Sequence, residues 1–156
     1  MTRKYHLAQI NIARTREPLD HPLLKDFVDQ LDAVNALAER SPGFVWRLQT
    51  EEGDATSIQA FDDPLIIVNM SVWESFEALK TFVYSGEHLR VLRNRGAWMD
   101  KLSTPALALW WIPAGEIPTL ESAKAALHLL ERQGPSPEAF TFAKPYPEPQ
   151  DQPVSA

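Results

Sequence analysis

The residues of this sequence best suited to chemistry are His88 and Arg95, in the segment GEHLRVLRNRGAWMDKL. Winding residues 86–102 as a helix at about 100° per residue places both on the arc that otherwise carries apolar side chains. A histidine titrates near neutral pH and can move a proton or bind a metal, while a guanidinium can hold a carboxylate or enolate oxygen. Two structural alternatives stay open: His88 bonded to a core carbonyl or carboxylate, and Arg95 in a buried salt bridge.

A second group of candidates lies on the segment LIIVNMSVW, the most strand-like of the chain. Alternation along a strand puts Asn69, Ser71 and Trp73 on one face. An amide that points into a pocket can orient a substrate carbonyl, although the same groups can also bond across a subunit interface or to a core water. The remaining tryptophans could either line a ligand pocket as flat apolar walls or simply pack in the hydrophobic core. They are Trp46, Trp98, Trp110 and Trp111.

Several other chemistries lack the residues they require. The sequence has no cysteine, which removes thiolate catalysis, disulfides and Cys-ligated metals together. His6, His21 and His128 fall on separate predicted elements, so the pattern predicts no metal site. The nucleophile-elbow, zincin, phosphate-loop and dinucleotide-binding motifs are also missing.

The elements that must position the candidates follow from hydrophobic periodicity and turn residues. We expect Asp20 to cap the first long helix, with Pro22 in its first turn, and Thr119 and Gly134 to bound the last. The expected order is strand 5–13, helix 20–40, strand 44–50, strand 65–73, helical pieces 74–84 and 86–102, strand 105–113 and helix 119–134. This order predicts an α+β fold of ferredoxin-like split βαβ type, with a four-stranded antiparallel sheet, helices on one face and an extra C-terminal helix.

Length and composition indicate one soluble domain. The 156 residues suffice for a single core, and the contents of 44% hydrophobic and 23% charged residues are ordinary for a globular protein. A net charge of −6 argues against a nucleic-acid partner, and no run reaches membrane-spanning length. The start of the chain lacks a secretory pattern, so we expect a cytoplasmic location.

Two segments are expected to be peripheral. The acidic stretch at 51–64 is longer than a usual hairpin loop and is either a mobile flap or an inert insertion. We expect residues 1–143 to form the domain and the proline-rich residues 144–156 to be a disordered, dispensable tail.

Three motifs resemble a bacterial family known as DUF3291, a domain of unknown function: NMSVWES, LWWIPAGEIPTLESA and GPSPEAFTF. The resemblance runs from about Tyr5 to Phe142. The family in turn resembles the dimeric α/β-barrel superfamily, which includes antibiotic-biosynthesis monooxygenases and haem-degrading monooxygenases. Its strand-end pattern, followed by a helix and then a serine with a nearby histidine, corresponds here to Val72, Trp73, Ser75, Ser85 and His88.

The resemblance implies a homodimer joined through the sheet faces, with a small-molecule pocket between each subunit's helices and its sheet. It implies a monooxygenase-like or isomerase-like enzyme without a cofactor, acting on a small aromatic or polyketide-like molecule. His88 would transfer the proton, Asn69 and Arg95 would hold an oxygen anion, and Ser71, Trp73, Trp98, Trp46 and Trp111 would line the pocket. The alternatives are a haem protein ligated by His88, whose axial histidine by resemblance would fall nearer Leu92, and a non-catalytic dimeric binding module.

Overall fold

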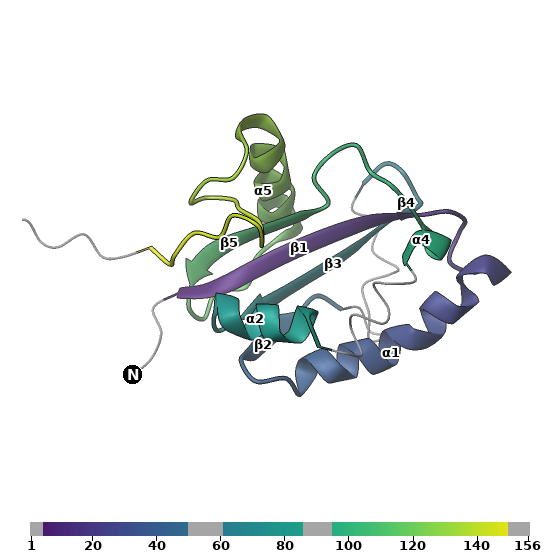
Figure 1. Cartoon of the computed structure of the whole chain (residues 1–156), viewed down its shortest axis with the longest axis horizontal. Coiled ribbons are helices and arrows are strands. Elements are labelled where there is room, and N and C mark those ends of the chain that lie inside the picture. The colour runs from purple at the N-terminus through teal and green to yellow at the C-terminus, as the bar shows by residue number, and fades with distance from the viewer. Residues whose placement is uncertain (1–4, 50–60, 86–94, 150–156) are drawn as a thin grey trace, which may run out of the picture.

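The centre of the computed structural model is an antiparallel sheet of five strands, within the described residues 5–49, 61–85 and 95–149 (Figure 1). The strands are β1 Tyr5–Thr15, β2 Phe44–Arg47, β3 Ile66–Trp73, β4 Met99–Asp100 and β5 Leu107–Pro113. β1 pairs with β3 along one edge and with both β5 and β4 along the other, and β2 lies outside β3. The four longer strands therefore follow the order β2-β3-β1-β5, which confirms the α+β, ferredoxin-like prediction.

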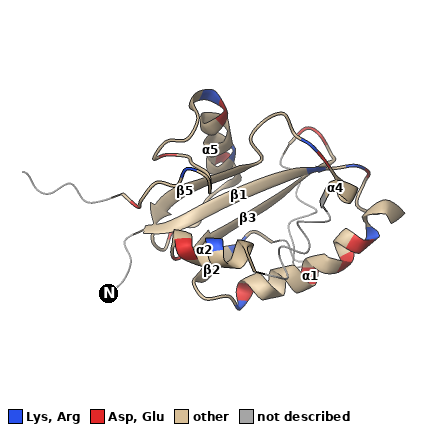
Figure 2. Ribbon diagram, viewed as in Figure 1, with Lys and Arg blue, Asp and Glu red and all other residues tan. Residues whose placement is uncertain are grey.

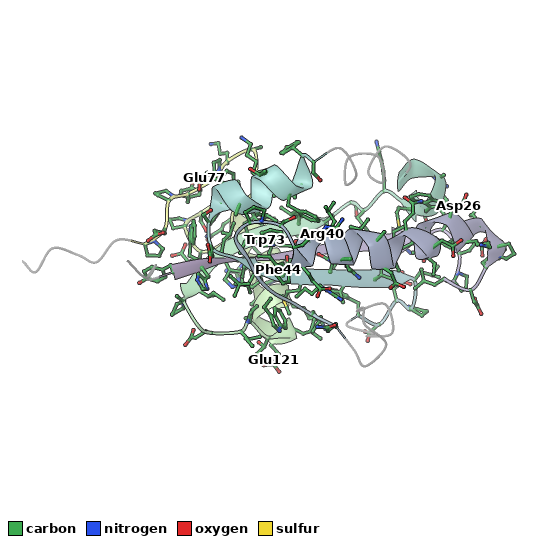
Figure 3. All side chains as sticks on the ribbon, turned by 90° about the horizontal axis from the view of Figure 1, so that it is seen from below. Asp26, Arg40, Phe44, Trp73, Glu77 and Glu121 are labelled. Atoms are coloured by element: carbon green, nitrogen blue, oxygen red, sulfur yellow. The ribbon has the colours of Figure 1, made fainter. Side chains whose placement is uncertain are left out.

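Helices cover both faces of this sheet. The four described helices of the α type are α1 Lys25–Glu39, α2 Phe76–Val83, α4 Arg95–Trp98 and α5 Leu120–Gln133. Figures 1 and 3 show α2 and α5 on opposite sides of the sheet, with α1 running beside it. The expectation that helices cover only one face is corrected, because α5 folds back across the other. We call the two faces the α2 face and the α5 face.

The α5 face is apolar because every second residue of three neighbouring strands is aliphatic or aromatic. Four residues of α5, Ala123, Ala126, Leu127 and Leu130, complete this cluster. Its strand members are Ala8, Ile10, Ile12, Val68, Met70, Val72, Ala108, Trp110 and Ile112. The ends of α5 agree with the prediction: Thr119 and Ser122 form a capping box, and Gly134 ends the helix with φ of 77°.

The first helix begins differently from the prediction. His21, not Asp20, caps the short 3₁₀ helix Pro22–Leu24, since its Nδ1 accepts a hydrogen bond from the backbone N–H of Leu23. The chain then continues directly into α1. Of the apolar stripe expected for this helix, Leu24 and Ala38 at its two ends are buried and Val28 is exposed. The remaining members, Phe27, Leu31 and Val34, are half-buried. α1 is therefore much less embedded than its sequence pattern suggests.

The predicted helix at 86–102 is shorter at its C-terminal end. Helical structure ends at Trp98, and Met99–Asp100 form β4 by pairing with Arg14 and Thr15 of β1. Arg14 also bonds to Asp100 at 2.7 Å between Nη1 and Oδ2, which fixes this extended segment. Residues 86–94, with His88, lie outside the described residues, and Arg95 is described only by its backbone.

The C-terminal segment packs on the sheet beyond α5. Phe140 exchanges two backbone hydrogen bonds of 2.8 Å with Leu109 of β5. Tyr146 lies against Phe140, and its backbone carbonyl accepts a hydrogen bond from Trp111 Nε1 at 3.0 Å. The expected tail thus contacts the domain at Tyr146, and residues 150–156 lie outside the described residues. Of the acidic stretch 51–64, residues 51–60 also lie outside them, so its two alternatives stay predictions.

Charged residues of both signs are mixed along the helices and loops (Figure 2). Along α1 the Asp and Glu positions are more prominent than the Lys and Arg positions, in keeping with the net charge of −6. No helix in the described part of the chain combines the length and the apolar content that crossing a bilayer requires.

Candidate functional site

Polar side chains form a band across three strands in the middle of the α2 face. The β1–β3 register places Gln9 opposite Ser71 and Asn11 opposite Asn69, and the β2–β3 register places Arg47 opposite Ser71. Since alternate residues of a strand share a face, all five side chains leave the sheet on the same side. We call these five residues, Gln9, Asn11, Arg47, Asn69 and Ser71, the polar band.

Hydrogen bonds fix the amides of this band. Gln9 Nε2 donates to Asn69 Oδ1 at 2.7 Å and to Ser71 Oγ at 2.8 Å. Ser71 Oγ also accepts a hydrogen bond from Trp73 Nε1 at 2.9 Å. Because Gln9 holds the oxygen of the Asn69 amide, the Asn69 NH₂ group is turned away from Gln9. Gln9 and Ser71 are buried, whereas Asn69 and Asn11 are exposed although both lie in central strands.

Aromatic side chains close the band at one end. Trp73 is buried, stacks on Phe82 of α2 at 5.1 Å between ring centroids and meets the edge of Phe44 at 5.5 Å. Figure 3 shows Trp73 and Phe44 close together, with Glu77 of α2 on one side and Glu121 of α5 on the other. Leu7, Leu79 and Leu109 belong to the same cluster. This end of the band is a packed apolar wall.

A separate apolar cluster closes the other end. Trp98 of α4 is buried and lies 5.5 Å from the ring of Phe27. Met99 and Leu24 complete the cluster, with Ala13 and Ile67 of the sheet packed against it. The polar band therefore lies between two apolar walls on the same sheet face.

Helix α1 spans the distance between these walls. Ala38 near its C-terminus belongs to the Trp73 cluster, and Phe27 near its N-terminus packs against the Trp98 cluster. Leu31 and Val34 in its middle belong to none of the three apolar clusters of the described residues. A hollow of about 460 Å³ lies between α1 and α4 and is lined by Asp26, Asp29, Gln30, Ala97 and Trp98.

A β-bulge determines which residue of β2 joins the polar band. Phe44 pairs with Trp73, but the next pair is Trp46 with Val72, so Val45 is an extra residue. Without it, strict alternation would place Trp46 beside Ser71 and turn Arg47 to the α5 face. The bulge instead brings Arg47 to the α2 face, where its Nε and Nη2 donate to Glu39 Oε1 at 3.2 and 3.1 Å.

The structure brings together some of the predicted site residues and separates others. Asn69, Ser71 and Trp73 adjoin one another, and Trp98 lies in the opposite wall. Trp46 packs on the α5 face and cannot share a pocket with them. Trp111 lies on the α2 face but is packed in the Trp73 cluster beside Phe140. Among the described residues, no group of three or more His, Asp or Glu side chains could hold a metal ion.

Three members of the band were not predicted: Gln9, Asn11 and Arg47. For the first two a signal was present, since polar residues at positions i and i+2 of an otherwise apolar strand mirror the spacing of Asn69 and Ser71. For Arg47 no local signal existed, because simple alternation assigns it to the wrong face.

A model of the family described as Domain of unknown function (DUF3291) matches residues 6–156. The chain belongs to this family. No curated protein matches this DUF3291 chain.

Solved structures similar to this DUF3291 protein include a putative antibiotic biosynthesis monooxygenase from Nitrosomonas europaea. Its sequence is 13% identical, the TM-score is 0.47, and the match covers 75% of this chain and 95% of that one. SnoaB, a cofactor-independent oxygenase from Streptomyces nogalater, is 16% identical with a TM-score of 0.44, over 72% of this chain and 95% of its own.

Proposed function

We propose that the protein binds a small aromatic or polyketide-like molecule on its α2 face and acts on it as a cofactor-independent, monooxygenase-like or isomerase-like enzyme. The observation that carries the proposal is the polar band, which lies between two apolar walls and exposes the amides of Asn11 and Asn69. Ligand sites combine apolar walls with a few oriented polar groups.

The amide of Asn69 is the group best placed to act on a ligand. Gln9 fixes its orientation, and the turned-away NH₂ can donate to a carbonyl or phenolic oxygen of the ligand. A donor aimed at an oxygen that gains negative charge stabilises the corresponding enolate. Asn11, opposite Asn69 in the register, can bond to the same ligand edge.

The reaction that suits this arrangement starts with removal of a proton from an activated CH₂ group of the ligand. His88 and Arg95 keep their proposed roles from the sequence, with His88 as the base and Arg95 as a further anion-holding group. The resulting carbanion can reduce O₂ directly, so that CH₂ and O₂ become C=O and H₂O. If O₂ is excluded, return of the proton to another carbon gives an isomerase.

A non-catalytic binding module is the second candidate, and one observation favours it. Three hydrogen bonds join Gln9, Asn69, Ser71 and Trp73 to one another, as expected for polar groups that only satisfy each other. The two candidates differ at Asn69, because a purely structural amide has no part in turnover.

Oxygen uptake with an anthrone-type substrate, which carries an acidic CH₂ between aromatic rings, tests the proposal. We expect turnover by the native protein and a loss of about 100-fold in kcat in the Asn69→Ala variant, as for removal of an oxyanion donor. Gln133→Ala, at an exposed position at the end of α5, is the matched amide control. Ligand binding without uptake in either protein favours the binding module.

The haem alternative has a separate test. Reconstitution with haem followed by an absorbance scan should give no Soret band if the pocket takes a free aromatic ligand. A stoichiometric Soret band that disappears in the His88→Ala variant would establish the haem protein instead.

We also propose that the protein is a homodimer, and the position of α5 changes the interface we expect. Because α5 covers much of the α5 face, an interface through that face would have to include α5 itself. Light scattering at micromolar concentration should give twice the 17.6 kDa mass of one chain. A monomer would argue against sheet-face association.

A further inference from the structure

We propose that Arg47 is the anion-binding residue of the site and that the natural ligand is an aromatic carboxylate, which Arg47 binds in place of Glu39. Because the polar band is the ligand site of the proposed function, this assignment depends on that function. It adds the chemical class of the ligand.

The burial of Arg47 is the first support. Among the described residues, it is the one cationic side chain in the buried class, at 8% exposure, and it lies beside Ser71 in the polar band. A buried ion pair is weak evidence for stabilisation, because desolvation offsets much of the attraction. A guanidinium at this depth therefore calls for a reason other than folding.

The pairing with Glu39 is the second support. A guanidinium matches a carboxylate best when two of its N–H groups meet two different oxygens. Here Nε and Nη2 both bond to the same oxygen of Glu39, at 3.2 and 3.1 Å. The Glu39 side chain is itself 49% exposed, so it can turn into solvent and leave the guanidinium to another carboxylate.

The bulge at Val45 is the third support. One inserted residue exchanges Trp46 for Arg47 on the α2 face, opposite Ser71 of β3. Bulges are frequent next to functional sites, where they change the face from which a side chain leaves the sheet. The redirected residue here carries the charge that a ligand carboxylate needs.

The test compares two ligands that differ by one carboxylate group, 2-naphthol and 3-hydroxy-2-naphthoate, by calorimetric titration of the whole protein. In Arg47→Gln we expect the naphthoate dissociation constant to rise about tenfold or more, with naphthol changed less than about twofold. In Glu39→Gln, which removes the competing carboxylate, naphthoate should bind several-fold more tightly. Opposite effects of the two partners cannot come from a purely structural salt bridge.

Matched controls come from two exposed residues of α5, Arg132 and Glu121, on the other side of the sheet. Arg132→Gln and Glu121→Gln change the net charge equally and should leave the ratio of the two dissociation constants unchanged. Should Arg47→Gln fail to fold, Arg47→Lys keeps the charge and loses the fork, and it should still weaken naphthoate selectively.

The possible outcomes distinguish a failure of the Arg47 assignment from a failure of the proposed function. If both ligands bind the native protein and Arg47→Gln weakens them equally, or if Glu39→Gln weakens naphthoate, the assignment of Arg47 is overturned while the proposed function stands. If neither ligand binds the native protein, the proposed aromatic site is overturned, and the assignment of Arg47 with it.

Discussion

The two faces of the central sheet are built from alternate residues of the same strands, yet they differ in kind. On the α5 face, Ile10 and Met70 are members of one continuous apolar cluster under α5. On the α2 face, Gln9 and Asn69 interrupt the apolar surface and divide it into two clusters. The difference shows that the α5 face is packed throughout, whereas the α2 face gives up part of its packing for polar groups.

The largest difference in stability between the two faces is expected when two adjacent residues of β3, one on each face, are shortened to alanine. Met70→Ala should lower the free energy of unfolding by about 2–5 kcal/mol, because it leaves a cavity in a fully packed cluster. Asn69→Ala should change it by less than about 1 kcal/mol, since the side chain is exposed and Gln9 keeps Ser71 as a partner. Urea unfolding of both variants measures the difference. Equal losses would contradict the division between the faces.

A smaller loss is expected where α2 is attached to its face. Gly43 has φ of 85°, and a Cβ added there would lie 2.5 Å from Cβ of Ala78 in α2. Gly43→Ala should therefore cost roughly 1–3 kcal/mol through backbone strain and this clash. Thermal unfolding measures the loss. Ala78→Gly alone should cost about 1 kcal/mol of helix stability, so the clash is measured by the coupling in a double-mutant cycle of the two changes. Zero coupling would mean that strain alone is responsible.

Removal of residues 144–156 tests how much the C-terminal segment stabilises the edge of the α2 face. The sequence predicted no effect, but the Trp111 indole donates to the carbonyl of Tyr146, and losing that acceptor should cost about 1–2 kcal/mol. The melting temperature of the truncated chain measures this. Tyr146→Phe, which keeps the carbonyl and the ring, should have a smaller effect. An unchanged melting temperature after truncation would restore the sequence-based expectation.

The smallest effect concerns a pair at the end of β1. The hydrogen bond from Arg14, aided by the backbone N–H of Leu65, lowers the pKa of the Asp63 carboxyl below its usual 3.8. The Asp63 carboxyl therefore binds a proton more readily in the unfolded state than in the folded state. Its stabilisation of the fold is present above about pH 3.8 and is lost as the pH falls through the lowered pKa of the folded state. Stability of Asp63→Asn should depend less steeply on pH below 4. An unaltered slope would show that the pair does not matter.

Local signals predicted most of the elements, because their causes lie within a few residues. Thr119 and Gly134 bound α5 as predicted, since side chains and backbone geometry at those positions act on their own neighbours. The polar pair Asn69 and Ser71 was predicted to share a face for the same reason.

Features that depend on pairing between distant segments were not predicted. Gln9 becomes part of the site only through its register with β3, and Met99–Asp100 leave the helix because β1 offers them hydrogen bonds. Arg47 was missed because a single inserted residue reverses the alternation of β2. Periodicity describes a segment alone, whereas each of these outcomes is decided by its partner.

The pairing of Phe140 with Leu109 also bears on self-association. The outer edge of a sheet exposes N–H and C=O groups that can template the addition of strands from other molecules. Both hydrogen bonds of Leu109 on that side are taken by Phe140 of the same chain. The C-terminal segment thus acts as a built-in edge cap, and a chain cut before Phe140 should aggregate by strand addition at β5 even where its core remains folded.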